Sequence, residues 1–157
     1  MRSDLVTERL AIGSCPRGPH DVAELKRRYG ITAVVSLQPP DETARSGVDP
    51  EQLQQVYRLQ GVVAERVPIR DFAPDELLRA LPACLEVLAR LHGEGHSVYL
   101  HCHAGENRSP TVAIAYLHAR AGMKLDAARD LVEMQHPCAP YAEVLARLGE
   151  LLSPTPV

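Results

Sequence analysis

A cysteine and an arginine with five residues between them separate an apolar strand pattern from an apolar helical pattern. Residues 97–100 predict a strand, and residues 111–121 predict a helix that begins close to Pro110. Proline fits the first turn of a helix because its missing N–H has no partner to lose there. The chain between Cys102 and Arg108 is therefore a short loop at a helix N-terminus.

This loop has the length and composition of an anion-binding site. The residues between the cysteine and the arginine are His103, Ala104, Gly105, Glu106 and Asn107. Their backbone can curl once with its N–H groups inward, and such a ring at a helix N-terminus binds a doubly charged oxyanion. Gly105 adopts conformations that other residues resist, and the planar fork of Arg108 matches two phosphate oxygens. We predict that residues 103–108 bind phosphate, and that phosphate, sulfate or vanadate would inhibit the site. We call residues 102–109 the anion loop.

The same surroundings predict a reactive Cys102. A free thiol titrates near pH 8.5, and a helix N-terminus with a nearby cation lowers its pKa to about 3.5–7.5. Cys102 is therefore expected to be a thiolate at neutral pH and a nucleophile. The hydroxyl of Ser109 is placed to hydrogen-bond the sulfur. A bound phosphate above this thiolate implies in-line attack and a phosphocysteine intermediate.

The rest of the chain alternates strand and helix patterns. Strands are expected at 8–12, 31–37 and 62–69, and helices at 19–29, 49–60, 74–92, 124–135 and 140–152, with a loop at 38–47. Pro82 is expected to kink or restart the helix that contains it. These patterns predict an α/β fold with a central, mainly parallel sheet of four to five strands flanked by helices. Residues 1–157 are expected to form one domain.

Composition limits the partners and the compartment. The net charge of −3 lacks the basic bias that favours nucleic acid, and no apolar run approaches the roughly 20 residues of a membrane span. The four cysteines lack paired spacing, which favours a reducing cytosol. Cys15, Cys84 and Cys138 are expected to be ordinary thiols, although any of them could trap Cys102 as a disulfide. The seven histidines show no metal-ligand spacing, so no metal or cofactor is expected.

The run His-Cys-His-Ala-Gly-Glu-Asn-Arg-Ser, residues 101–109, resembles the signature loop of the dual-specificity phosphatases. These belong to the superfamily of cysteine-dependent protein tyrosine phosphatases. The resemblance implies a phosphoric monoester hydrolase that needs no cofactor and acts on phosphorylated protein, glucan or a small phosphate monoester. In this family His101 is expected to support the loop by hydrogen bonding.

Within the family, the chain is most similar to the plant glucan phosphatases, a group that acts like laforin. The similar pieces are Gly-Ser-Cys at 13–15, Pro-His-Asp-Val at 19–22, Ser-Leu-Gln at 36–38, Ile-Arg-Asp-Phe at 69–72 and Leu-Pro at 81–82. In that group the aromatic residue that follows the general-acid aspartate lines the substrate channel. Phe72, which follows Asp71, occupies this place. The alternative is that Phe72 packs beneath the acid and positions it.

A thiolate nucleophile needs an acid to protonate the leaving oxygen. Asp71 follows a predicted strand and precedes a predicted helix, so it is expected at the carboxyl edge of the sheet. The family resemblance implies the same residue, which would later activate the hydrolytic water. The alternatives are that Asp71 only caps the helix, or that Asp75 is the acid.

Two other classes of function remain open. A phosphate-binding module without hydrolysis usually lacks the cysteine, the arginine or the acid, and all three are present here. Arsenate reductases and sulfur transferases also use a cysteine in an anion loop. In arsenate reductases related to the low-molecular-weight phosphatases the loop lies near the N-terminus, whereas here it lies two-thirds along the chain.

Overall fold

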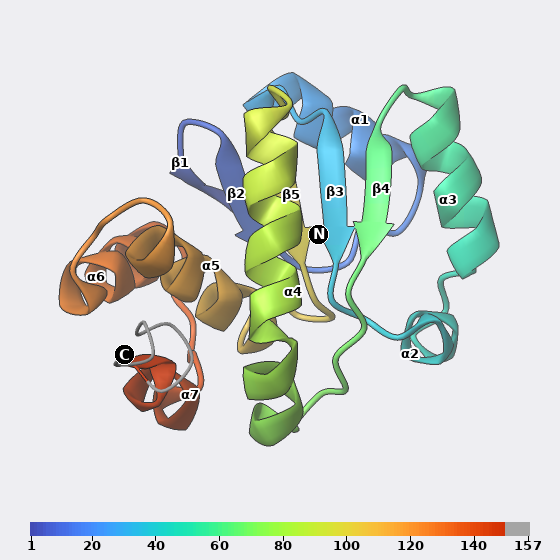
Figure 1. Cartoon of the computed structure of the whole chain (residues 1–157). Helices are drawn as coiled ribbons and strands as arrows, with labels where there is room; N and C mark the ends of the chain where they lie inside the picture. The colour runs from blue at the N-terminus through green and yellow to red at the C-terminus, as the bar shows by residue number, and fades with distance from the viewer. Residues whose placement is uncertain (150–157) are drawn as a thin grey trace.

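The computed structural model describes residues 1–149 and shows a mixed sheet enclosed by helices (Figure 1). The strands are β1 (Ser3–Thr7), β2 (Leu10–Gly13), β3 (Ala33–Ser36), β4 (Val63–Arg66) and β5 (Val98–His101). The helices are α1 (Pro19–Tyr29), α2 (Pro40–Arg45), α3 (Pro50–Leu59), α4 (Pro74–Gly93), α5 (Arg108–Ala119), α6 (Leu125–Gln135) and α7 (Ala142–Ala146). The predicted α/β fold with a mainly parallel sheet is confirmed.

The order of the strands places the anion loop at the centre of one sheet edge. The order is β1-β2-β5-β3-β4, and both β2 and β3 run parallel to β5. Gly13 and Ser36 lie beside His101 at the ends of these three strands. Because parallel strands deliver their following loops to the same edge, the segments after β2, β3 and β5 meet there.

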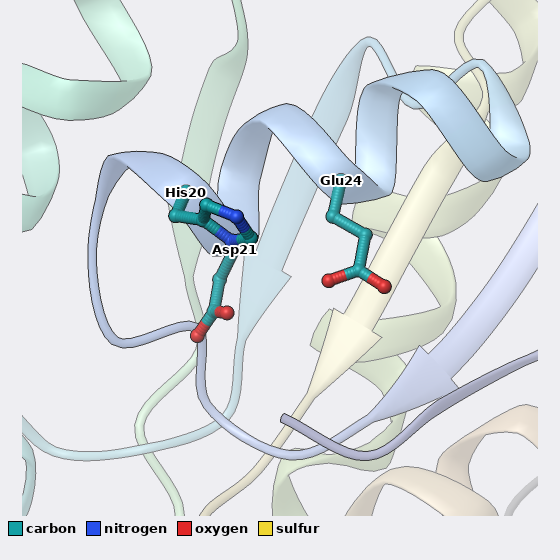
Figure 2. A group of neighbouring side chains, drawn as sticks. All are labelled: His20, Asp21 and Glu24. Atoms are coloured by element: carbon teal, nitrogen blue, oxygen red, sulfur yellow. The ribbon is translucent and has the colours of Figure 1, made fainter.

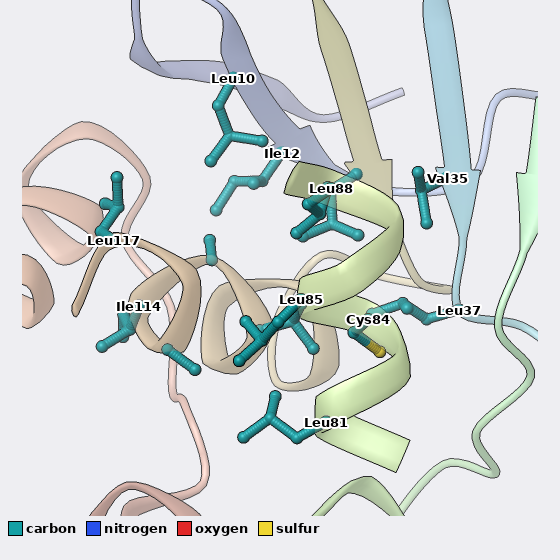
Figure 3. Packing of buried hydrophobic residues seen from close by; sticks show 14 of the residues in the cluster. Leu10, Ile12, Val35, Leu37, Leu81, Cys84, Leu85, Leu88, Ile114 and Leu117 are labelled. Atoms are coloured by element: carbon teal, nitrogen blue, oxygen red, sulfur yellow. The ribbon is translucent and has the colours of Figure 1, made fainter. Parts of the chain in front are cut away.

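Alternate residues of the three inner strands β2, β3 and β5 enter two hydrophobic cores. Val35 and Leu100 join the larger core, where they meet the leucines of α4 and apolar residues of α5 (Figure 3). Val34 and Tyr99 point to the opposite face and pack with residues of α1 and α3. Both faces of β5 are therefore covered, which explains its continuous apolar sequence.

Strand β1 was not expected from the sequence. It pairs antiparallel with β2 at the edge of the sheet, and its pattern places Ser3 and Val6 inward. An edge strand that buries only one face carries a short and partly polar signal, which periodicity does not detect in five residues.

Segment 38–47 was expected to be a loop, but it contains the helix α2. Pro40 stands in its first turn, and Asp41 and Arg45 form an i,i+4 ion pair at 2.7 Å. A six-residue helix is too short to show a hydrophobic period. This helix places Glu42 beside the anion loop.

Two other helix predictions need correction. Helix α4 continues through Pro82 as one element of 20 residues, so the expected restart there is wrong. The buried leucine stripe, with Leu81 and Leu85 on either side of the exposed proline, holds both halves against the core. The last predicted helix, 140–152, is interrupted after α7 (Ala142–Ala146) by a turn at Arg147, and its predicted end at 150–152 lies outside the described residues. None of the helices within residues 1–149 is long and apolar enough to cross a membrane.

Candidate active site

Cys102 lies between the central strand and the N-terminus of α5. Its side chain is 2% exposed, and its Sγ lies 3.4 Å from the Oγ of Ser109 in the first turn of α5. The helix begins at Arg108, with Pro110 in its first turn. The structure therefore brings together the thiol, the hydroxyl and the helix N-terminus that the sequence predicts.

The carbonyl groups of the anion loop point outward, to donors elsewhere in the chain. The pairs are His103 O with Cys15 N (3.0 Å), Gly105 O with His136 Nε2 (2.7 Å), Glu106 O with Ala139 N (2.9 Å) and Asn107 O with Thr111 Oγ1 (2.7 Å). In a trans peptide the N–H of the next residue points opposite to the carbonyl. Within residues 1–149, the N–H groups of residues 103–107 donate to no protein acceptor. These groups can therefore surround an oxyanion.

The loop packs directly on the end of β2. Gly105 has φ +73°, a conformation that favours glycine, and a Cβ at this position would lie 2.6 Å from the carbonyl carbon of Gly13. No side chain fits between these two backbones. Gly105 is thus required both for the turn of the loop and for its contact with the sheet.

Arg108 is buried, with 1% exposure, and both terminal nitrogens of its guanidinium donate hydrogen bonds to protein acceptors. Nη1 and Nη2 donate to the two carboxylate oxygens of Glu42 at 3.1 and 2.8 Å, and Nη1 also donates to Ile69 O at 2.8 Å. Burial acts to raise the pKa of Glu42, but the hydrogen bonds from Arg108 and Gln38 outweigh it and lower that pKa. Glu42 is therefore an ionised partner that fixes the orientation of the arginine.

One edge of this guanidinium remains available. The Nε of Arg108 has no partner among the described residues, and Nη2 lies 3.4 Å from Oδ2 of Asp71. A bidentate phosphate contact uses two parallel N–H groups of this kind. The geometry suits binding of two phosphate oxygens on the side of the arginine nearest to Asp71.

The structure separates the two candidate acids. Asp71 lies beside Arg108, with its side chain 28% exposed, and its Oδ1 accepts the N–H of Phe72 at 3.1 Å. The side chain of Asp75, on the first turn of α4, is 84% exposed and pairs with Arg147 at 3.9 Å. Asp71 is thus the carboxylate that the fold brings to the anion loop.

Phe72 has a strained backbone and an exposed ring. Its φ of 57° is rare for an aromatic residue, and its side chain is 81% exposed, so the ring does not pack beneath the acid. Its N–H is shared between Oδ1 of Asp71 and Oη of Tyr141, each at 3.1 Å. These two hydrogen bonds hold the turn that places Asp71.

Beside the loop lies an open groove of about 240 Å³. It is lined by Glu42, Arg45, Ser46, Asp71 and His103. The side chain of His103 is exposed there. Glu106 instead forms an ion pair with Arg2 at 3.0 Å, so its carboxylate is bound to a neighbouring cation.

His101 lies beneath the loop and is fully buried. Its Nδ1 is 3.0 Å from the carbonyl oxygen of Cys102, so Nδ1–H donates to that oxygen. Burial lowers the pKa of His101 to about 4, and the ring is neutral at physiological pH. The predicted hydrogen bond from His101 to the loop is therefore present in the structure.

Three residues beside the site were missed by sequence reasoning: Glu42, His136 and Tyr141. Glu42 lies on α2, in the segment that follows the buried parallel strand β3, and this placement after a strand was a usable signal. His136 and Tyr141 carry no local motif, and their contacts with the loop exist only in the folded chain.

The other thiols lie in different surroundings. Burial raises the pKa of Cys15 and Cys138 to about 11 and that of Cys84 to about 12. All four cysteines are free, and the backbone of Cys15 contacts the loop through His103 O. These three thiols are therefore protonated at neutral pH.

Among the described residues, one group of side chains has the spacing of metal ligands: His20, Asp21 and Glu24 on α1 (Figure 2). Asp21 accepts the backbone N–H of Arg17 at 2.9 Å, and Glu24 pairs with Arg28 at 3.5 Å. Local contacts explain two of the three side chains, and none of them belongs to the anion loop.

Comparison with known proteins identifies the class that this fold and site define. Residues 16–149 match the model of the dual specificity phosphatase catalytic domain, so the chain belongs to the dual-specificity phosphatase family. The family resemblance seen in the signature loop is confirmed.

The individual relatives include the glucan phosphatases expected from the sequence. Phosphoglucan phosphatase LSF1, chloroplastic, of Arabidopsis thaliana is 33% identical over 93% of this chain and 24% of its own length. Laforin of Mus musculus is 27% identical over 80% of the chain and 41% of its own length. The chain thus spans less than half of these relatives. Among solved structures, Tk-PTP in the active form has a TM-score of 0.75 with 27% identity, covering 96% of this chain and 95% of that one.

Proposed function

We propose that the chain is a metal-independent cysteine phosphatase that hydrolyses phosphate monoesters. The observation that carries this proposal is the convergence at one loop of the thiol of Cys102, the fork of Arg108 and the carboxylate of Asp71. The family match supports the same chemistry.

The mechanism follows from the positions of these groups. The phosphate dianion binds the inward N–H groups and the free edge of Arg108. The sulfur of Cys102 attacks phosphorus in line, the ester P–O bond breaks, and protonated Asp71 gives its proton to the leaving oxygen.

The second half of the reaction regenerates the enzyme. Water attacks the phosphocysteine, its proton passes to the carboxylate of Asp71, and the S–P bond breaks to release inorganic phosphate. The hydroxyl of Ser109 stabilises the departing thiolate of Cys102 by a hydrogen bond.

The test is turnover of an aryl phosphate by wild type and by Cys102→Ser. Serine has no strong base in this site, so turnover should vanish while binding of inorganic phosphate persists. Cys138→Ser is the matched control, because this half-buried thiol takes no part in the mechanism. Turnover by Cys102→Ser, or a requirement for added divalent metal, would refute the mechanism. Binding of phosphate without turnover by wild type would support a phosphate-binding module, and reduction of arsenate would support an arsenate reductase.

The substrate class is open between phosphorylated protein and phosphorylated glucan. Similarity to phosphoglucan phosphatase LSF1 and laforin favours glucan. The exposed ring of Phe72 beside Asp71 also offers an apolar face to a sugar ring. The deciding experiment compares phosphotyrosine and phosphothreonine peptides, phosphoinositides and phosphorylated amylopectin with the aryl phosphate.

A further inference from the structure

We propose that His136 is a positioning residue for the anion loop and that it acts together with Asp4 of strand β1. The inference rests on the proposed function of the loop in binding phosphate. His136 follows α6, and its side chain is fully buried between β1 and the loop. Its Nε2 lies 2.7 Å from Gly105 O, and its Nδ1 lies 2.7 Å from Oδ2 of Asp4.

Each nitrogen of the His136 ring has a hydrogen-bond partner. The carbonyl oxygen of Gly105 carries no proton, so Nε2–H of His136 donates to it. The other nitrogen, Nδ1, shares a proton with Oδ2 of Asp4, and this second hydrogen bond fixes the orientation of the ring.

This contact determines the direction of one peptide group in the loop. By holding Gly105 O outward, His136 turns the N–H of Glu106 inward, because the two groups of a trans peptide point in opposite directions. The carbonyls of His103 and Glu106 are held by backbone N–H groups instead. His136 is thus a buried side chain that orients one N–H donor of the anion site.

The hydrogen bond between His136 and Asp4 connects the loop to the N-terminal strand. β1 pairs with β2 and packs against α6, so Asp4 approaches His136 from the edge of the sheet. Arg2, two residues before Asp4, contacts the side chain of Glu106 instead of the loop backbone. Both side chains of this second pair are partly exposed, at 38% and 46%, and exposed pairs contribute little.

The test measures the dissociation constant of inorganic phosphate and kcat/KM for an aryl phosphate. The variants are His136→Phe, which removes both hydrogen bonds, His136→Gln, which can keep the one to Gly105, and Asp4→Asn. Arg2→Gln is the matched control. Leaving a buried acceptor such as Gly105 O without its hydrogen bond corresponds to about 10–100-fold in binding. We expect losses in this range for His136→Phe, smaller losses for His136→Gln and Asp4→Asn, and none for Arg2→Gln.

A merely structural role predicts a different pattern. Such a role would lower the melting temperature of the variants but leave phosphate affinity and kcat/KM of the folded protein at wild-type values, and this result would overturn the inference. If His136→Phe does not fold, unchanged phosphate affinity in folded His136→Gln and Asp4→Asn would equally overturn it. If wild type hydrolyses no phosphate ester while the variants bind phosphate more weakly, the positioning role stands and the proposed function fails.

Discussion

Replacing Glu42 by glutamine tests whether the carboxylate on α2 holds Arg108 in its binding orientation. Glutamine keeps the size of the side chain, and its one oxygen can still accept from the guanidinium, but the negative charge is lost. Breaking a buried ion pair costs about 3–5 kcal/mol because it leaves a buried charge unpaired. The side chain of Glu42 is 16% exposed and one hydrogen bond survives. We therefore expect a loss of about 2–3 kcal/mol in the free energy of unfolding.

Two assays measure this loss for Glu42→Gln. For a protein of this size, 1 kcal/mol corresponds to about 2–4 °C, so the melting temperature should fall by about 4–12 °C. If Arg108 then stabilises the transition state less by a similar amount, about 1.5–3 kcal/mol, kcat/KM should fall about 10–100-fold. Inorganic phosphate can replace the missing negative charge, so saturating phosphate should raise the melting temperature of the variant more than that of wild type.

Asp41→Asn is the control from the same helix. The side chain of Asp41 is 70% exposed and pairs with Arg45, not with Arg108. Its removal should change neither the melting temperature nor kcat/KM measurably. Wild-type stability and kcat/KM in Glu42→Gln, or equal losses in Asp41→Asn, would refute the assignment of Glu42 as the group that orients the arginine.

Three further predictions follow from the site. Asp71→Asn should slow alkyl phosphates, which are poor leaving groups, by about 10²–10⁴-fold and activated aryl phosphates much less, whereas Asp75→Asn should show no such dependence; the reverse pattern would reassign the acid. The pKa of His101 is about 4 when folded and 6.5 when free, so between these values the unfolded chain binds a proton that the folded chain does not. Stability should therefore fall as the pH drops from 6.5 to 4, by about 3 kcal/mol from this residue, and His101→Asn should flatten that part of the curve of unfolding free energy against pH. Phe72→Ala should reduce activity on phosphorylated amylopectin more than on an aryl phosphate, and an unchanged ratio of the two activities would exclude contact with glucan.

The centre of the site could be predicted because its chemistry is local in the chain. Cys102, Arg108 and Ser109 lie within eight consecutive residues, 102–109, between a strand and a helix that have clear patterns. The alternation of strands and helices likewise predicted the parallel sheet. Asp71 followed from the rule that functional side chains gather at the carboxyl ends of parallel strands.

The surroundings of the loop could not be predicted in this way. Glu42 contacts Arg108 across 66 positions, His136 contacts Gly105 across 31, and Tyr141 contacts Phe72 across 69. None of these pairs has a sequence spacing that encodes its contact. Strand β1 was missed for a related reason, because its stability comes from pairing with β2 and not from its own composition.

The contacts of the anion loop have a consequence for protein synthesis. The carbonyls of the loop are held by Ala139 and by His136, and Asp4 of the N-terminal strand in turn holds the His136 ring. The ribosome releases a chain from its N-terminus, and domains fold as units. A nascent chain that has exposed Cys102 but not yet His136 and Ala139 therefore lacks two of the groups that hold the loop carbonyls. The nucleophile should acquire its reactive surroundings only after this later segment has emerged from the ribosome.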